Sequence, residues 1–343
     1  MGKYIDEKIE LLDERGFLKD FGYSYRMVFD YNRNKIKTNL FSLKEWDFYQ
    51  IKHQDYIIQM TFGHVSYAAN FSFNIFNVKT GRKISISKIK LFPFKSLNMP
   101  EDPDKNTQLF YKDKEFNICF TINNYRRILD FNFKGYKGKS QKKIYIEVQI
   151  ELFNKKDENR IVIVTPFEKK NQFYLNCKEN FFNIAGKVNI DDIVFDFDSN
   201  DTAVLDWGRG VWPYKHQWFW GNGAAVINNN RFAFNLGWGF GSDGSPKENI
   251  YFLNGKPYKI ENLKYDIDLQ NYMNKWHFYD EKGKLDLEMT PIFDNYTENK
   301  LLIVNTKCHQ VFGYFNGYVK SDNGEKININ NLLAFCEHAI NRW

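Results

Sequence analysis

The stretch SFNIFNVKTGRKISISKIKLF, residues 72–92, contains the pattern that decides the fold. Apolar and polar residues alternate from Phe71 to Val78, KTGRK (79–83) supplies a turn signal, and alternation resumes over 84–92. Side chains of a β-strand point alternately to its two faces, so this pattern predicts two antiparallel strands that each bury one face.

The same pattern recurs along most of the chain, with turn signals such as Asn254-Gly255 and Lys282-Gly283 between the runs. Many short strands with few helical patterns favour an all-β fold of antiparallel sandwiches or barrels. The run 55–78 alternates well in its second half, and further strands are expected at 143–153, 160–167, 231–240, 284–293 and 309–319.

The N-terminal segment is the one place where a helix is expected. Ile5, Ile9 and Leu12 share one helical face, and Gly16 ends the run, which predicts a short helix within 1–16. Beyond it we expect two β domains, at 17–185 and 186–343, and the second contains a tryptophan-rich motif. The division falls within the interval from about 170 to about 200.

Composition and charge exclude several classes of function. The chain has 343 residues and a net charge of +6 without a basic block, so a nucleic-acid partner is not expected. It has neither a signal peptide nor a run of about 18 apolar residues, so we expect a cytoplasmic protein with no integral membrane segment. No metal or cofactor motif is present, and none is expected to bind. Four widely spaced cysteines are expected as reduced thiols: Cys119, Cys177, Cys308 and Cys336.

The stretch LDWGRGVWPYKHQWFWGNG, residues 205–223, holds half of the eight tryptophans. Trp and Tyr present large apolar faces with one polar tip, so the cluster could form a rigid wall for a ligand. The alternative is a packed core. The candidate ligand-binding residues here are Trp207, Trp212, Tyr214, Trp218 and Trp220.

One carboxyl, Asp206, and one guanidinium, Arg209, lie within this stretch. Burial of Asp206 beside Trp207 would raise the pKa of its carboxyl and keep a proton available, as a catalytic acid requires. Arg209 would either clamp an anionic group or pair with Asp206 as a structural clip. Gly208 and Gly210, which flank Arg209, predict irregular backbone at this point.

Polar residues that interrupt apolar strands complete the candidate site. By the two-residue period of a strand, His64 and Tyr67 face opposite sides, and His64 would point into a barrel or serve as a packing residue. Glu337 and His338 are adjacent, so only one of them is expected to face a site. The candidates are His64, Tyr67 and Asn235 for ligand binding, and Glu337 and His338 for catalysis beside Asp206 and Arg209.

Several motifs carry a family resemblance. The runs LDWGRGVWPY, WFWGNG, FNLGWGFG, KENIYFLNGK and EHAINRW, with LLDERGFLKDFGYSYR near the start, resemble the bacterial domain-of-unknown-function 2804 family. The resemblance implies two packed, lipocalin-like antiparallel β-barrels, similar in layout to carotenoid hydratases and tocopherol cyclases. It also implies a ligand cavity inside or between the barrels, in which a carboxylic acid protonates an alkene or epoxide without a cofactor. Asp206 or Glu337 would supply that acid, and the abundance of Tyr and Asn predicts a smaller or more polar ligand than a carotenoid.

Three hypotheses about function follow. The first is an acid–base enzyme of hydratase, cyclase, isomerase or lyase type that acts on an amphipathic or polar small molecule. A variant of this hypothesis is a glycoside-active enzyme, because two carboxyls and aromatic platforms also suit a sugar. The second is a non-catalytic, lipocalin-like binder or carrier, which predicts that Asp206 pairs with Arg209. The third is a structural protein with no pocket beside residues 207–220.

Overall fold

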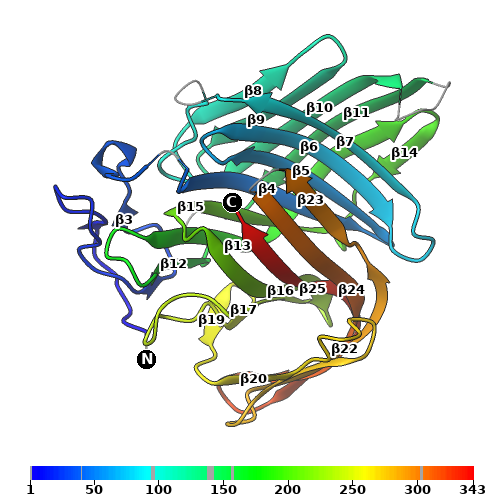
Figure 1. Ribbon diagram of the computed structural model, residues 1–343. Coiled ribbons are helices and arrows are strands. Elements are labelled where there is room, and N and C mark those ends of the chain that lie inside the picture. The colour runs from blue at the N-terminus through cyan, green and yellow to red at the C-terminus, as the bar shows by residue number, and fades with distance from the viewer. Residues whose placement is uncertain (1, 40, 94–96, 137–142, 156–157, 302–303) are drawn as a thin grey trace.

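The computed structural model describes the chain except for residues 1, 40, 94–96, 137–142, 156–157 and 302–303. The described residues form two strongly curled antiparallel sheets that pack against each other (Figure 1). The only helical element among them is one 3₁₀ turn, Arg33–Lys35. The expected all-β fold of two packed barrels is confirmed.

The first sheet contains the predicted hairpin at one edge, where Phe76 of β6 pairs with Lys83 of β7. Three short strands attach to its main path, namely β2 (Tyr23–Ser24), β12 (Ile161–Pro166) and β14 (Ile193–Asp196). The path runs in the order β7 (Lys83–Leu91), β6 (Ala68–Asn77), β5 (Tyr56–His64), β4 (Leu43–His53), β15 (Thr202–Val211), β13 (Phe173–Ile190), β11 (Lys143–Phe153), β10 (Arg126–Tyr136), β9 (Phe116–Asn123) and β8 (Thr107–Lys112).

The second sheet is formed by the C-terminal part of the chain. A short strand, β23 (Thr297–Leu301), pairs with β24 beside its main path. The path runs in the order β19 (Lys256–Lys259), β18 (Ile250–Leu253), β17 (Asn230–Trp238), β16 (Lys215–Ile227), β25 (Lys326–Arg342), β24 (Val304–Lys320), β22 (Leu285–Asp294), β21 (Trp276–Asp280) and β20 (Leu263–Asp266).

Each sheet curls until its own inward side chains meet across the barrel. In the first sheet the rings of Phe73 in β6 and Phe131 in β10 stack with centroids 4.5 Å apart. In the second sheet the rings of Phe234 in β17 and Phe315 in β24 lie 5.1 Å apart. Both barrel interiors are therefore filled by apolar side chains, and burial of this area is the main stabilising contribution.

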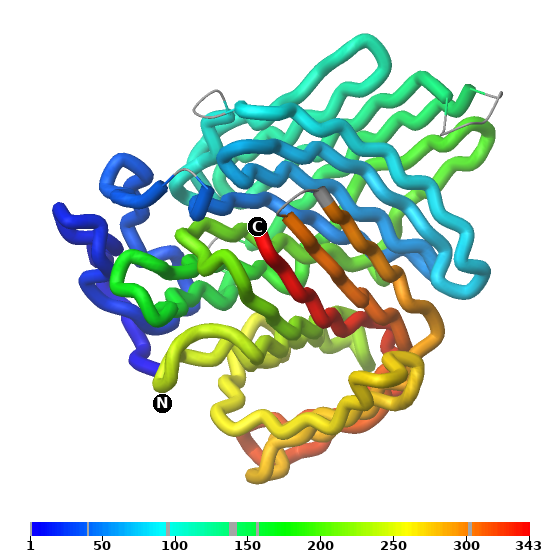
Figure 2. The backbone as a smooth tube through the Cα atoms, in the orientation of Figure 1, coloured from blue at the N-terminus to red at the C-terminus, as the bar shows by residue number. Residues whose placement is uncertain are grey.

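The chain passes from one sheet to the other between Val211 and Lys215. The boundary expected at residue 185 lies inside β13, and both β13 and β15 belong to the first sheet. The short connection places the tryptophan-rich stretch where the two sheets meet, and Figure 2 shows the second half of the chain following directly beneath the first.

The prediction of a helix within residues 1–16 is wrong. The segment is extended, and β1 (Ile9–Glu10) pairs in parallel with β3 (Phe29–Asp30). Both Leu11 and Leu12 are buried, although they are adjacent and would point in different directions from a helix. A helix of this length is marginal on its own, so pairing and burial against the first barrel determine its conformation.

Candidate functional site

A cavity of about 410 Å³ lies between the two sheets rather than inside either barrel. One wall is formed by β4, β5, β13 and β15 of the first sheet, and the opposite wall by β16, β24 and β25 of the second. Its walls are largely aromatic, and the principal rings belong to Trp46, Phe48, Tyr174, Trp212, Trp218 and Trp220.

Strand alternation decides which residues of β15 reach this cavity. Asp206 lines it, whereas the next residue, Trp207, points to the other face and is fully buried in the core of the first barrel. Trp207 is therefore not part of the cavity wall. Trp212, Trp218 and Trp220 are part of it, and the rings of Trp212 and Trp218 lie 5.7 Å apart.

Asp206 is a buried carboxyl with few compensating partners. Its Oδ1 accepts a hydrogen bond of 2.6 Å from Nδ2 of Asn176 and a long one of 3.5 Å from the hydroxyl of Tyr174. Burial raises the pKa of Asp206, the Lys178 ammonium opposes this shift, and the negative charge of Glu248 adds to it. The net effect favours the protonated acid.

Glu337 lies in the same cavity on the second sheet. Its Oε1 accepts a 2.7 Å hydrogen bond from the indole Nε1 of Trp218, and its Oε2 a 3.4 Å bond from Nε2 of Gln310. Burial raises the pKa of Glu337, the bond from Trp218 lowers it, and the charge of Asp206 raises it again. Two carboxyls from different sheets thus influence one another's ionisation across the cavity.

An ion pair that the sequence analysis did not find completes this end of the cavity. Nζ of Lys178 lies 3.1 Å and 3.0 Å from the two carboxylate oxygens of Glu248, and 4.3 Å from the ring centroid of Trp220. Both charged residues are buried, and Lys178 belongs to β13, a strand of otherwise mostly apolar residues. A lysine inside such a buried strand is the signal that could have identified it.

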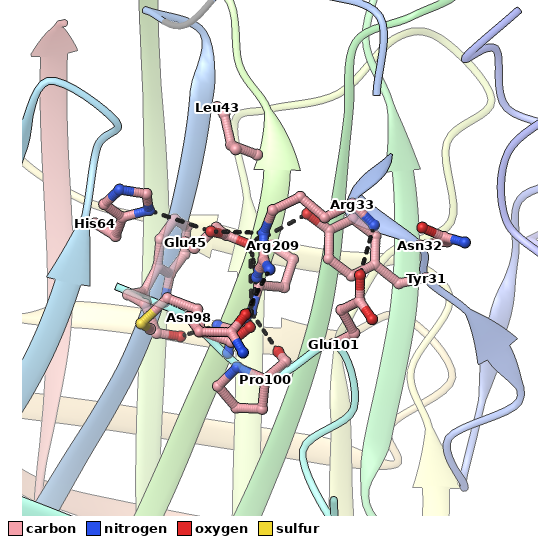
Figure 3. A network of polar contacts seen from close by, with 12 residues as sticks. Tyr31, Asn32, Arg33, Leu43, Glu45, His64, Asn98, Pro100, Glu101 and Arg209 are labelled. Carbon is pink, nitrogen blue, oxygen red and sulfur yellow. Dashed lines mark hydrogen bonds and ion pairs between the residues drawn. The ribbon is translucent and has the colours of Figure 1, made fainter. Parts of the chain in front are cut away.

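Arg209 lies on the opposite face of β15 from Asp206, inside the first barrel. Figure 3 shows it within a network of polar contacts beside Glu45 and Pro100. Its Nη2 donates to Oδ1 of Asp47 at 2.7 Å, and its other N–H groups donate to the carbonyls of Trp46, Gly208 and Pro100. The pair between Asp206 and Arg209, one of the two alternatives for Arg209, does not form, because residues three apart on a strand face opposite sides. Arg209 is a clip that joins β4, β15 and the loop at Pro100.

His64 belongs to the same buried polar network, which Figure 3 shows in close-up. Its Nδ1 lies 3.2 Å from Oε2 of Glu45, whose Oε1 accepts a 2.7 Å bond from Nη2 of Arg33. Both His64 and Glu45 also touch the rim of the cavity. His64 therefore lies in a hydrogen-bonded network inside the first barrel, beside the carboxylate of Glu45.

The adjacent pair Glu337 and His338 divides between the two faces of β25, as expected. Nδ1 of His338 lies 2.7 Å from the hydroxyl of Tyr272, and its ring stacks on Phe219 with centroids 4.0 Å apart. Burial lowers the pKa of His338 to about 4, so the ring is neutral at physiological pH. His338 is a packing residue of the second barrel, on the face of β25 opposite the cavity.

The remaining candidates lie around the cavity rather than inside it. Oδ1 of Asn235 accepts a 2.8 Å bond from the indole of Trp220, and its Nδ2 donates to the Glu248 carbonyl, so Asn235 fixes the wall from behind. Tyr67 is half-buried close to the opening, where Lys44 lies over its ring. Tyr214 is exposed in the connection between the sheets.

Gly208 allows the close approach of Trp46 to β15. The expected irregular backbone at Gly208 and Gly210 is wrong, because β15 is a regular strand from Thr202 to Val211. A Cβ at position 208 would collide with the indole of Trp46. The glycine is thus required for packing, and it lets a tryptophan lie flat against the strand that carries Asp206.

The fold and the cavity define a two-barrel, all-β protein with buried acids between its sheets. The chain belongs to the family described as domain of unknown function 2804 (DUF2804), whose model matches residues 3–343. No curated protein matches the chain. In the described residues no group of three or more His, Cys, Asp or Glu side chains could hold a metal ion, and no helix there is long and apolar enough to cross a membrane.

Solved structures with the same architecture share little sequence with this chain. Kievitone hydratase from Nectria haematococca has a TM-score of 0.52 at 8% identity, and the match covers 88% of each chain. The protein CghA, solved with Sch210972, has a TM-score of 0.51 at 8% identity, and the match covers 89% of each chain. At this identity the likeness concerns the fold alone.

Proposed function

We propose that the protein is a cofactor-independent acid–base enzyme that converts a small, largely apolar molecule in the cavity between its sheets. The observation that carries this proposal is the presence of two buried carboxyls, Asp206 and Glu337, with raised pKa values in one aromatic-walled cavity. A raised pKa keeps a carboxylic acid protonated up to a higher pH, which suits it to donating a proton to a bound substrate.

The hydrogen-bond partners favour different roles for the two carboxyls. Glu337 accepts N–H bonds from Trp218 and Gln310, which stabilise its anionic form and suit a base. Asp206 would donate its proton to a carbon–carbon double bond or an epoxide of the substrate. The faces of the tryptophan rings would then stabilise the developing cation. Addition of water to the cation would complete a hydration. Loss of a proton from the cation to Glu337 would instead complete an isomerisation.

The placement of Arg209 favours an enzyme over a carrier. A carrier with an inert cavity was expected to neutralise Asp206 with Arg209, whereas Arg209 pairs with Asp47 in the first barrel. The architecture shared with kievitone hydratase is compatible with water addition in the cavity. The same pair of carboxyls would serve a glycoside, because one acid could protonate the leaving oxygen while rings stack on the sugar.

The test begins with the molecule that the protein binds in its own host. Native mass spectrometry, compared with a denatured sample, identifies a ligand that departs on unfolding. That ligand is then incubated in D₂O with the wild type, Asp206→Asn and Glu337→Gln. We expect the wild type alone to place carbon-bound deuterium in a product, while both variants still bind the ligand.

The products distinguish the alternatives. Water addition raises the ligand mass by one water, isomerisation or cyclisation changes retention without adding water, and glycoside cleavage gives two fragments. A ligand that the wild type binds tightly and returns unchanged, without deuterium, would contradict the enzyme and favour the carrier.

A further inference from the structure

Lys178 and Asp206 are neighbours on one wall of the cavity. They lie directly opposite each other in the antiparallel pair of β13 and β15, and both line the cavity. The Cβ atoms of two residues paired in this way are about 4.5–5.5 Å apart, within reach of a lysine side chain. A lysine ammonium beside an aspartate lowers the pKa of the carboxyl by about 1–3 pH units. A Lys178 without another partner would therefore favour the ionised form of Asp206.

The ammonium of Lys178 has a different partner, the carboxylate of Glu248. Nζ lies 3.1 Å and 3.0 Å from the two carboxylate oxygens, and the two side chains are only 4% and 2% exposed. The ring of Trp220 contacts the same ammonium and adds a cation–π interaction. Among the residues that the structure describes, no ion pair joins Lys178 to Asp206. The charge of Lys178 is thus balanced without Asp206.

The surrounding backbone holds Glu248 in this position. Glu248 belongs to the loop between β17 and β18, and its side chain passes over Gly237 of β17, where a Cβ would collide with the carboxylate. Nδ2 of Asn235 donates to the Glu248 carbonyl at 3.0 Å, and the Gly237 N–H donates to Oδ1 of Asn249 at 2.7 Å. The sequence runs FNLGWGFG and KENIYFLNGK therefore supply the residues that fix one carboxylate beside Lys178.

We infer that Glu248 is a positioning residue that holds the Lys178 ammonium away from Asp206, so that Asp206 keeps the proton that it donates to the substrate. This inference rests on the proposed function, in which Asp206 is the acid. The electrostatics of the cavity agree with the geometry. Burial raises the pKa of Asp206, the charge of Lys178 opposes this rise, and the charge of Glu248 adds to it.

Other titratable groups lie around the same carboxyl. The hydroxyl of Tyr174 on β13 donates to Oδ1 of Asp206 at 3.5 Å, and Glu337 acts on Asp206 from β25. Lys259 of β19 acts on Glu248, and its Nζ donates to a backbone carbonyl of the same loop at 3.2 Å. Lys178, opposite Asp206 on the neighbouring strand, is therefore the cation that loss of the Glu248 carboxylate releases.

The test is the titration of Asp206, followed by carbon-13 nuclear magnetic resonance of protein labelled at the aspartate side-chain carboxyl. The signal that disappears in Asp206→Asn belongs to Asp206. Glu248→Gln keeps the size of the side chain, and the pH midpoint of the Asp206 signal should fall by about 1–3 pH units in this variant. Lys178→Met/Glu248→Gln removes both charges and should return the midpoint to the wild-type value.

The double variant separates positioning from a direct effect of the Glu248 charge. A midpoint in Lys178→Met/Glu248→Gln that stays as low as in Glu248→Gln would show that Glu248 acts through its own charge, and would overturn the inference. An unchanged midpoint in Glu248→Gln would overturn it as well. If Glu248→Gln does not fold, the double variant decides alone, because a midpoint more than about one pH unit from the wild-type value contradicts a balanced pair.

A matched control removes a glutamate from an ion pair elsewhere on the second sheet. Glu288 of β22 pairs with Lys275 at the surface, so Glu288→Gln should leave the Asp206 midpoint unchanged. A midpoint that falls equally in Glu288→Gln would show that the shift is not specific to the pair in the cavity, and would overturn the inference.

Activity distinguishes this inference from the proposed function. With the ligand recovered by native mass spectrometry, Glu248→Gln should place at least about tenfold less deuterium in the product at a pH above both midpoints, because a midpoint one pH unit lower leaves about a tenth of the protonated acid. The double variant should regain the activity. A wild type that returns the ligand unchanged would refute the proposed function, whereas an active wild type with an unchanged midpoint in Glu248→Gln would refute the positioning role alone.

Discussion

Replacement of Asp206 by Asn removes an ionisable group from the cavity and keeps its shape. The amide oxygen of the new side chain can still accept the bond from Nδ2 of Asn176. In the wild type the pKa of Asp206 is raised by burial above the ordinary value of 3.8. The folded state therefore keeps this proton up to a higher pH than the unfolded state does.

The sign of the effect on stability follows from linkage. Below pH 3.8 the carboxyl is protonated in both states, and its contribution does not change with pH. As the pH rises above that value, the unfolded state loses its proton first, so the wild type loses stability until the pH exceeds the raised pKa of the folded state. Asp206→Asn has no such loss, so its melting temperature should rise relative to the wild type across this window.

Each unit by which burial raises the pKa of Asp206 lowers the free energy of unfolding of the wild type by about 1.4 kcal/mol once both states have ionised. An unfolding entropy of about 2.1 cal/mol/K per residue gives about 0.7 kcal/mol/K for the chain, so each unit shifts the difference in melting temperature by about 2 °C.

The assay is calorimetric melting of both proteins from about pH 4 to about pH 8, and the pH at which the difference stops growing gives the pKa in the folded state.

A difference for Asp206→Asn that does not change with pH would contradict the raised pKa of Asp206, and would remove the basis for a catalytic acid at this position.

Three further variants test the structure around the site. Arg209→Ala should lower the free energy of unfolding by about 3–5 kcal/mol in urea titrations, because it leaves the Asp47 carboxylate buried without its partner; a loss below about 1 kcal/mol would contradict the clip. Gly208→Ala should displace the indole of Trp46, change the near-ultraviolet circular dichroism and cost about 1–3 kcal/mol, and an unchanged spectrum would refute the packing argument. Burial lowers the pKa of Lys44 to about 7. The melting temperature of Lys44→Met should therefore exceed that of the wild type, by most at and below pH 7 and by less toward pH 10. An advantage that is independent of pH would show that this lysine titrates normally.

Local alternation predicted most of the strands because it depends only on neighbouring residues. The hairpin around residues 79–83 and the opposite orientation of Glu337 and His338 both follow from the two-residue period of a strand. The same period could have excluded a pair between Asp206 and Arg209, which are three residues apart on one strand.

Long-range contacts could not be predicted in this way. Asp47 precedes its partner Arg209 by 162 residues, and no local pattern indicates which strands become neighbours. The ion pair of Lys178 and Glu248 also joins the two halves of the chain. The prediction of an N-terminal helix was wrong for a related reason. The apolar spacing of this segment fits a helix, but pairing with a strand farther along the chain holds the segment extended.

The two acids come from different sheets, Asp206 from β15 and Glu337 from β25. A folding intermediate in which only one sheet has formed holds one acid and half of the cavity wall. In the proposed mechanism neither half alone could bring a proton donor and an acceptor together, so activity would require both halves to have folded and docked. Loss of activity would consequently report separation of the halves before either one unfolds.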